Sequence, residues 1–483
     1  MLKAAAVSED EKFRYEEVIR YVRELISSGT LTPGNKAPSL RRLSKARNVS
    51  VSTVLQAYRI LESQGELEAR PQSGFYIREP LPPTAPPTPM RSGSKERLIK
   101  SGKKVSTMFS QAIDDSLVPL GCAIPSPQLL VGSQLDKFLI RAARTEGMHA
   151  NTYSPPQGFE ELREVIARRS MLWGHLCSPD DILITGGCTE ALHLALRVST
   201  KPGDTVAVES PNYFGFLPIL REQGLKVVEI PTDAVDGLSL PVLEKVLKSE
   251  QARVCLFSSA FNNPLGCLTS EAKKSDVLKL LNRYRATLIE DDIYGDIYFG
   301  HERPRPYSAM EEARDVIYCS SFSKTVAPGY RIGWVSSERH IDRLLEARYG
   351  SSLCSPVLPQ LAVARFLNGG AYDNHLRRLR TELKDNIRLV SRAVTDTFPQ
   401  HTRISRPEGG FVLWVELPKA IRTRELFNKA IEAGICFAPG DLFTTTEHYR
   451  SCLRLSCGYS CDSTLERAIW QLGAMAAQMI EKN

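Results

Sequence analysis

Apolar and polar residues in the first 80 positions alternate with a helical period and then with a strand-like one. A helical apolar stripe begins at Tyr15 and ends before Gly29. A second helix is expected after Ser39, a good N-cap residue, and a third from about Ser52. Two short runs, 67–70 and 75–77, read as strands. This order of helices and hairpin predicts a winged helix-turn-helix.

The pattern changes from about residue 113. Apolar runs of five or six residues then alternate with helical stretches for over 300 residues. Such alternation predicts a mainly parallel sheet with helices on its faces, and from about residue 375 a smaller α+β subdomain. The predicted strands are 181–185, 205–209, 254–258, 286–291 and 316–320.

A proline-rich stretch separates the two patterns. Residues 80–89 contain six prolines, so neither a helix nor a central strand is expected there. An extended conformation of about 3.1 Å per residue fits this composition. We therefore predict three parts: a winged helix-turn-helix domain over 1–79, a basic linker over 80–112, and a large domain over 113–483.

Composition and charge narrow the class of protein. A chain of 483 residues with 42% hydrophobic and 24% charged residues is typical of globular proteins. No apolar stretch resembles a signal peptide or a membrane span, so a cytoplasmic location without a membrane partner is expected. The 11 cysteines have spacings that fit neither zinc nor iron–sulfur ligation, and no metal site is predicted.

The net charge of +7 is unevenly placed. The first 110 residues carry 19 Lys or Arg against 11 Asp or Glu, so the basic excess lies wholly there. Five basic residues and no acidic one fall between Lys36 and Arg47, as phosphate contacts require. Ser50, Ser52 and Thr53 open the third helix, where small polar residues reach base edges or phosphates. Charge alone leaves an ordinary basic surface helix equally open.

Motif detail favours the DNA reader. The stretch GTLTPGNKAPSLRRLSKARNVSVSTVLQAYRILESQGELEARPQSGFYI, starting at Gly29, closely resembles the GntR family of bacterial regulators, and the resemblance covers about residues 13–78. Val51 departs from the family, since many members have Arg there. The partner that the resemblance implies is double-stranded DNA. The contacts that it implies come from Arg41, Ser50, Ser52, Thr53, Ser73 and Gly74.

The large domain carries short motifs that suit an aldehyde cofactor. Lys324 ends the run SSFSK after a predicted strand; its amine can form an imine, and the serines before it can bind phosphate, as can Arg331. Asp291 ends another strand, where a carboxylate can keep a pyridine nitrogen protonated, and the Tyr294 phenol can bind the ring 3'-oxygen. Each motif taken singly also fits a solvated lysine or a polar strand end.

Four further pieces fit the same cofactor. Gly187, Cys188 and Thr189 turn from a strand into a helix, whose N-terminus can hold a phosphate. Tyr213 can stack on a ring, although an ordinary core aromatic fits as well. Asn263 can bind the 3'-oxygen or form a turn, and Tyr153 begins a Pro- and Gly-containing loop.

In this order the motifs resemble the class I aminotransferases among the fold-type I pyridoxal 5'-phosphate (PLP) enzymes, over about residues 115–480. The resemblance implies an α/β fold-type I transferase with a mainly parallel, seven-stranded-type sheet and a small α+β domain. It makes Lys324 the catalytic Schiff-base lysine, Asp291 the partner of the pyridine nitrogen, and Arg454 the clamp of a substrate carboxylate. The remaining cofactor ligands that it implies are Gly187, Cys188, Thr189, Tyr213, Asn263, Tyr294, Ser321, Ser323, Arg331 and, on the neighbouring subunit's phosphate, Tyr153.

A GntR-type reader joined to an aminotransferase-like body is similar to the MocR subfamily of regulators. That similarity implies a PLP-dependent transcription regulator, a domain-swapped homodimer, and a DNA affinity tuned by PLP or by an amino acid or other amine. Two alternatives stay open on the sequence. One is a working aminotransferase with an accessory DNA-binding domain; the other is a pure PLP sensor of vitamin B6 metabolism.

Overall fold

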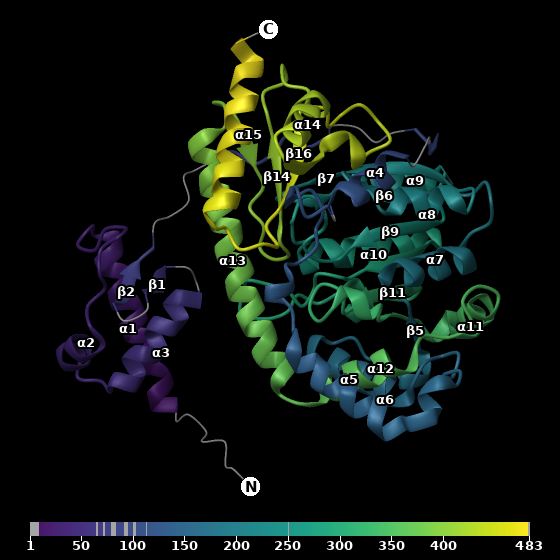
Figure 1. The fold of residues 1–483 in the computed structure, drawn as a ribbon, viewed down its shortest axis with the longest axis horizontal. Helices are drawn as coiled ribbons and strands as arrows, with labels where there is room; N and C mark the ends of the chain where they lie inside the picture. Colours follow the sequence, from purple (N-terminus) through teal and green to yellow (C-terminus); the bar gives the residue numbers. More distant parts are fainter. Residues whose placement is uncertain are drawn as a thin grey trace. The chain divides into compact units, whose positions relative to one another are not determined.

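The fold comes from a computed structural model that describes residues 9–63, 66–70, 73–78, 84–90, 95–99, 103–112, 114–249 and 251–481. The chain divides into two compact units, 1–83 and 84–483, and each is considered by itself. The N-terminal unit has the winged helix-turn-helix order that the sequence predicts (Figure 1). Its elements are α1 (Glu9–Ser27), α2 (Leu40–Arg47), α3 (Val51–Ser63), β1 (Leu67–Arg70) and β2 (Gly74–Ile77).

Local signals in the sequence account for the helix-turn-helix. The Ser39 hydroxyl accepts a hydrogen bond from Arg42 N and caps α2, which ends at Asn48 in the left-handed conformation, φ 50°. The helices bury their apolar stripes together, and the Tyr58 hydroxyl donates to Pro38 O at 2.7 Å. The antiparallel pair β1–β2 forms the wing.

The main sheet of the C-terminal unit runs in the order β3-β7-β6-β9-β10-β11-β12-β5, with β8 paired to β7. Strands β7, β6, β9, β10 and β11 are mutually parallel, and β12 runs antiparallel to both of its neighbours. Apart from the two-residue β3 and β8, these are the seven strands of the predicted fold class. Their bounds are β3 (Arg97–Leu98), β5 (Ile182–Thr185), β6 (Thr205–Ser210), β7 (Lys226–Asp233), β8 (Gly237–Leu238), β9 (Val254–Ser258), β10 (Thr287–Asp291), β11 (Val316–Ser321) and β12 (Gly333–Ser336).

Helices cover both faces of this sheet, so its strands are buried nearly throughout. One buried cluster joins the sheet to α7, α8 and α11, and another joins it to α9 and α10. The helices around the sheet are α5 (Ser133–Glu146), α6 (Glu160–Ser170), α7 (Cys188–Ser199), α8 (Phe216–Glu222), α9 (Leu240–Lys248), α10 (Glu271–Tyr284), α11 (Ile341–Tyr349) and α12 (Val357–Asn368). Short 3-10 turns are η1 (Pro127–Leu129), η2 (Gly147–Asn151), η3 (Met171–Trp173), η4 (Pro179–Asp181), η5 (Tyr307–Ala309), η6 (Pro328–Tyr330), η7 (Glu338–His340) and η8 (Gly440–Leu442).

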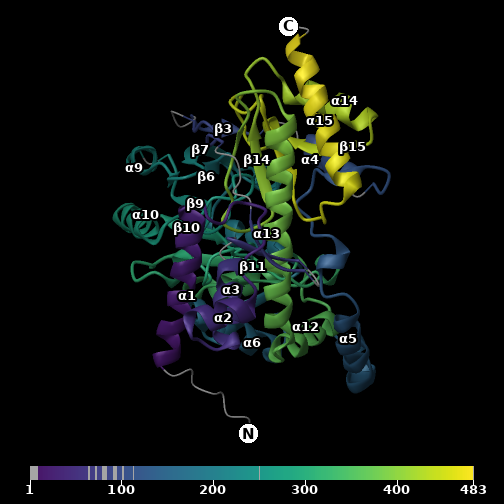
Figure 2. The same cartoon turned by 90° about the vertical axis from the view of Figure 1, so that its left-hand side faces the viewer.

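A second sheet, of order β13-β14-β16-β15-β4, forms the smaller part of the same unit. The long helix α13 runs beside β14 and α15 (Figure 2). Strand β4 reaches this sheet from far upstream in the sequence and pairs in parallel with β15. The bounds are β4 (Val118–Leu120), α13 (Ala371–Thr397), β13 (Arg403–Ile404), β14 (Val412–Glu416), α14 (Thr423–Glu432), β15 (Ile435–Pro439), β16 (Cys452–Ser456) and α15 (Ser463–Glu481).

The stretch predicted as a linker, 80–112, is built into the C-terminal unit where the structure describes it. Thr88 N donates to Glu416 Oε2 at 2.6 Å, and Arg406 Nη2 donates to Thr84 O at 3.1 Å. Residues 97–98 form β3 against β7, and helix α4 spans Lys103–Ala112. The described parts of this stretch therefore pack on the C-terminal unit, where they meet polar side chains at Arg406 and Glu416 and the edge of β7.

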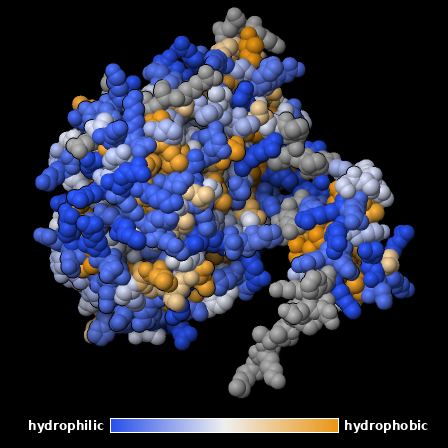
Figure 3. All heavy atoms as spheres, turned by 180° about the vertical axis from the view of Figure 1, so that it is seen from behind, coloured by the Kyte–Doolittle hydropathy of each residue, from blue (hydrophilic) through white to orange (hydrophobic). Residues whose placement is uncertain are grey.

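No helix among the described residues is long and apolar enough to cross a membrane. The face shown in Figure 3 is mostly hydrophilic, with hydrophobic side chains in small separate patches.

Candidate functional site

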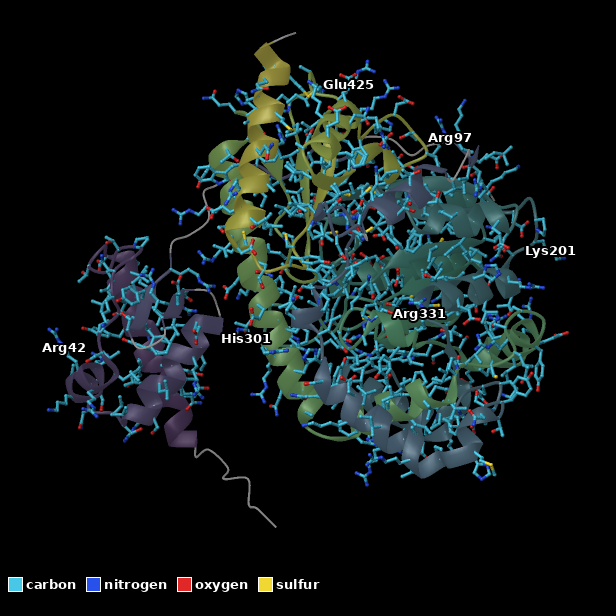
Figure 4. The ribbon with its side chains drawn as sticks, in the orientation of Figure 1. Arg42, Arg97, Lys201, His301, Arg331 and Glu425 are labelled. Carbon is cyan, nitrogen blue, oxygen red and sulfur yellow. The ribbon has the colours of Figure 1, made fainter. Side chains whose placement is uncertain are left out.

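The nucleic-acid candidate residues lie on α2, on α3 and in the wing. Arg41 is exposed on α2, and its neighbour Arg42 projects outward from the same helix in Figure 4. Arg47 instead lies over the Tyr21 ring, 4.4 Å from its centroid. The exposed guanidinium groups on α2 therefore form a surface that suits phosphate oxygens.

The start of α3 separates two exposed serines from a buried threonine. Ser50 and Ser52 are exposed, and their hydroxyl oxygens lie 2.7 Å apart. Thr53 is only 7% exposed, and its hydroxyl lies 2.7 Å from Ser50 Oγ. The buried Thr53 hydroxyl therefore orients Ser50 and does not face outward. The position of Thr53 in the sequence did not reveal this.

The wing is held around Tyr76. Ser73 Oγ lies 2.7 Å from the Tyr76 hydroxyl, and Arg70 stacks on the Tyr76 ring at 4.2 Å. Gly74 has φ 104°, a conformation that L side chains rarely adopt. The two predicted wing residues, Ser73 and Gly74, thus shape the tip of the hairpin.

In the C-terminal unit, the candidate cofactor residues follow the carboxyl ends of neighbouring strands, where open α/β sheets bind ligands. Lys324 lies in the turn after β11, and its Nζ donates to Ala123 O at 2.7 Å. Burial lowers the pKa of Lys324 to about 8. A buried amine with a lowered pKa is neutral more often at moderate pH, as reaction with an aldehyde requires.

The two adjacent carboxylates after β10 have different partners. Asp291 accepts from the Cys188 thiol at 3.5 Å, and burial raises the pKa of Asp291 to about 7. Asp292 is engaged elsewhere: Arg303 Nη2 and the Tyr318 hydroxyl both donate to its Oδ2, at 2.6 and 2.8 Å. The charge of the Asp291 carboxylate raises the pKa of Lys324 against the larger effect of burial.

Three polar side chains gather near Asp291. Asn263 Nδ2 donates to the Tyr294 hydroxyl at 3.5 Å, and both residues are buried. Tyr213 packs edge-on against Phe216, with ring centroids 5.4 Å apart. Burial raises the pKa of both tyrosines, and Asp291 adds to each increase. The phenols of Tyr213 and Tyr294 and the Asp291 carboxylate are therefore close enough to interact.

Strand register brings the phosphate candidates together. Ser321 pairs with Gly333, and Gly333 pairs with Thr185, so the ends of β11 and β5 lie on either side of β12. Gly187 caps α7 with φ 99°, and a Cβ added to Gly333 would overlap the Gly187 backbone. Close backbone packing therefore requires glycine at 333, and the positive φ together with the nearby Arg331 guanidinium favours glycine at 187.

The side chains around this junction form a polar cradle. Ser321 Oγ and Ser323 Oγ lie 2.7 Å apart, and Arg331 Nη2 donates to Gly186 O at 2.6 Å. Thr189 is exposed on the first turn of α7. Figure 4 shows Arg331 among the central elements of this unit. A helix N-terminus with hydroxyls and a guanidinium is a suitable anion site.

Arg454 and Tyr153 differ completely in environment. Arg454 on β16 is fully buried; its Nη2 donates to Gly121 O, while Nε and Nη1 have no hydrogen-bond partner among the described residues. Burial lowers the pKa of Arg454. Tyr153 is 83% exposed and lies in a surface recess of about 890 Å³ formed by residues 150–154 and 352–359. The structure does not bring Tyr153 together with the other candidates within one chain.

Sequence reasoning missed the segment Gly121–Ala123, whose carbonyls meet both Lys324 and Arg454. Cys122, in its middle, is 4% exposed; burial raises the pKa of its thiol, and Arg454 and Lys324 act in the opposite direction. Every residue type has a backbone carbonyl, so these two acceptors could not be recognised from the sequence. The glycine and the nearby prolines were the only unusual residues in the stretch. Sequence reasoning also missed the contact between the Cys188 thiol and Asp291, because at Cys188 it considered only a contact of the backbone N–H with a phosphate.

These residues fit PLP. Among the described residues, Arg454 has two buried donors without partners and Asn263 Oδ1 is a buried acceptor without one, as expected of groups that bind a polar ligand. Lys324, the Asp291 carboxylate and the cradle at α7 match the aldehyde, ring nitrogen and phosphate in chemistry. No group of His, Cys, Asp or Glu in the described parts of the chain is arranged to hold a metal ion.

Comparisons with known proteins agree with this geometry. The model of the aminotransferase class I and II family matches residues 128–472, and that of bacterial regulatory proteins, gntR family, matches residues 14–77. YdcR of Escherichia coli K12, described as an uncharacterized HTH-type transcriptional regulator, is 36% identical over 97% of this chain and 100% of its own length. The chain belongs to the MocR-type family of helix-turn-helix regulators. PLP is the cofactor of its aminotransferase-type domain, as predicted.

Other similar proteins match mainly the aminotransferase part of this MocR-type chain. The 2-aminoadipate transaminase of Thermus thermophilus is 32% identical over 69% of the chain and 83% of its own length. The crystal structure of the α-aminoadipate aminotransferase LysN from T. thermophilus, complexed with N-(5'-phosphopyridoxyl)-L-leucine, matches with a TM-score of 0.74 at 28% identity. That match covers 80% of this chain and 97% of the LysN chain. The aminotransferase half thus has the fold of working transaminases, whereas YdcR matches nearly end to end.

Proposed function

We propose that this MocR-type regulator binds DNA through its N-terminal unit and that PLP, followed by an amino acid or other amine, sets the affinity. The observation that carries the proposal is the conjunction in one chain of an exposed basic reader with a buried lysine, carboxylate and arginine set. The exposed reader supplies affinity for DNA, and the buried set supplies selectivity for a small amine.

Each part of the buried set has a proposed role. Lys324 binds the aldehyde, and Asp291 keeps the pyridine nitrogen protonated, which makes the ring an electron sink. Asn263 and Tyr294 hold the 3'-oxygen, and Tyr213 stacks on the ring. Gly187, Cys188 and Thr189 would cradle the phosphate together with Ser321, Ser323 and Arg331.

Arg454 would bind the carboxylate of an amino acid through its two free donors. A planar guanidinium suits this bidentate contact better than an ammonium does. Because Arg454 is buried between Phe214 and Phe443, whose ring centroids lie 5.8 and 5.6 Å from its Cζ, a carboxylate there would be shielded from water. This favours an α-amino acid over a simple amine.

The DNA contacts that we propose come from Arg41, Ser50, Ser52, Ser73 and Gly74, with Thr53 fixing Ser50. The exposed Tyr153 suits a role at a partner subunit's phosphate in a domain-swapped homodimer. Since DNA is the proposed partner, we place the regulator in the cytoplasm. Residues 1–79 would read the DNA, residues 80–112 would connect the two domains, and residues 113–483 would bind the small-molecule ligand.

A DNA-binding titration at fixed salt tests this function. It compares the upstream intergenic region of the protein's own gene with a scrambled duplex of equal length, with and without PLP. Preference for the native duplex that changes with PLP supports the proposal. Equal binding to both duplexes, together with amino-acid turnover at about 1–1000 per second, would favour a working aminotransferase instead.

A further inference from the structure

One three-residue segment contacts both cations of the proposed ligand site. Ala123 O accepts from Lys324 Nζ at 2.7 Å, and Gly121 O accepts from Arg454 Nη2. Cys122 lies between them and is almost fully buried. The groups proposed to hold the aldehyde and the carboxylate are therefore oriented by neighbouring carbonyls of the same backbone.

The side chain of Met108 packs against this segment at Gly121. A Cβ added to Gly121 would overlap both Met108 Cε and Cys436 Sγ, so these two side chains fill the space beside Gly121. Met108 is 2% exposed and Cys436 is fully buried. On the other side the segment is fixed by Ser126 N, which donates to Gly458 O at 2.8 Å. Gly121–Ala123 is thus clamped between α4 and the second sheet.

Met108 lies on α4, the last part of the proposed connector 80–112. Helix α4 packs on β15, and β4 follows α4 in the chain and leads into Gly121. A displacement of Gly121–Ala123 would therefore press on α4 through Met108. Within one chain, this is a short covalent and packed path between the ligand site and the connector.

We propose that Met108 is a positioning residue that acts through Gly121–Ala123 on Lys324 and Arg454, and that it couples their occupancy to the connecting segment. The proposal rests on the proposed function for its ligand and its DNA readout. When Lys324 Nζ bonds to an aldehyde carbon, the two hydrogens of the neutral amine leave with the aldehyde oxygen as water. Ala123 O then loses the donor that it accepts from, and a carboxylate at Arg454 competes with Gly121 O.

The test compares Met108→Ala, Met108→Leu and Met479→Ala with the wild type. Met479 on α15 is a buried methionine of the same hydrophobic cluster, and the atoms nearest to Gly121 come from Met108 and Cys436, so Met479 controls for lost apolar volume. Two readouts are taken with PLP as the probe. The first is the pH midpoint of borohydride capture of PLP on Lys324, and the second is the factor by which PLP changes DNA affinity. Thermal unfolding of all variants shows that they are folded.

We expect Met108→Ala to raise the pH midpoint by about one unit, because a looser segment admits water to Lys324. It should also reduce the effect of PLP on DNA affinity to less than about twofold, while Met108→Leu restores both readouts. Equal behaviour of Met108→Ala and Met479→Ala in both readouts would overturn the proposal. If PLP does not change the DNA affinity of the wild type, the proposed function is contradicted. The pH midpoint of borohydride capture would still test whether Met108 positions Lys324.

Discussion

The two units place their functional residues in opposite environments. In the N-terminal unit, Arg41, Ser50 and Ser52 are exposed, and the neighbouring basic residues lie on the same helix. In the C-terminal unit, Asp291 and Arg454 are buried, and the pKa values of Lys324 and Asp291 are displaced by burial. We therefore expect DNA affinity to come from several basic residues, so that the loss of one has a small effect. Ligand binding should instead depend on single buried groups, so that the loss of one abolishes it.

The largest effect is expected at Lys324. Lys324→Ala should abolish the PLP adduct that borohydride fixes, because it removes the amine that is proposed to bind the aldehyde. Intact-protein mass spectrometry measures the adduct, and Lys201→Ala, which removes an amine from a surface turn, serves as the control. Stoichiometric labelling of the Lys324→Ala protein would mean that the buried site does not depend on this group.

The adjacent carboxylates give the next contrast. Asp291→Asn should slow the reaction of bound PLP with an α-amino acid by about 100-fold, since an amide cannot hold the ring nitrogen protonated. Asp292→Asn should instead lower the free energy of unfolding by about 3 kcal/mol, because Arg303 would be left buried with a weaker partner. Absorbance of the bound cofactor and thermal unfolding measure the two effects. An exchange of the two phenotypes would reverse the assignment of Asp291.

The pH dependence of PLP capture should reveal the burial of Lys324. With a pKa of about 8, the neutral fraction of the amine rises from about a tenth at pH 7 to about nine-tenths at pH 9. The capture rate should therefore increase by about tenfold over this range and then level off. Stopped-flow absorbance measures the rate. A rate that keeps rising to pH 10.5 would indicate an ordinary exposed lysine.

In the DNA-binding unit a single change should matter less and depend on salt. Arg41→Ala should weaken binding to specific and scrambled DNA alike and reduce the slope of log affinity against log salt by about one. Arg23→Ala is the control, because Arg23 is paired with Glu66 at 2.7 Å. Fluorescence anisotropy at several salt concentrations measures both. An unchanged slope would remove Arg41 from the phosphate contacts.

The smallest effect is a gain. Val51 is 44% exposed at the first residue of α3, where many GntR relatives are expected to have Arg. Val51→Arg should tighten DNA binding by a few fold and raise the salt slope by about one. Val51→Gln, which adds length without charge, should do neither. Tightening by both variants would show that the contact is not electrostatic.

The sequence predicted the order and approximate bounds of the elements in the N-terminal unit, because a local signal such as the Ser39 cap acts over a single helical turn; helix α1 nevertheless begins at Glu9, before the predicted stripe. The sequence also predicted β5 and four of the five parallel strands (β6, β9, β10 and β11), together with the motif residues at their ends, but it did not predict β7. It did not predict that residues 97–98 join the main sheet or that Val118–Leu120 joins the second one, since these pairings depend on open strand edges far away in the chain.

The site shows the same division. Side chains with distinctive chemistry, such as Lys324 and Arg454, were found from short motifs. The carbonyls of Gly121 and Ala123 were not, because every residue type carries one. Hydrogen-bond partners separated Asp291 from Asp292, and burial separated exposed Ser50 from buried Thr53.

Thermodynamic reciprocity provides the most direct test of the central claim that the buried site sets the affinity of the exposed one. The dissociation constant of PLP is measured with and without a saturating native duplex, beside that of DNA with and without saturating PLP. The account predicts that the two factors are equal and differ from one by more than about twofold. A PLP affinity that is the same with and without DNA would contradict it.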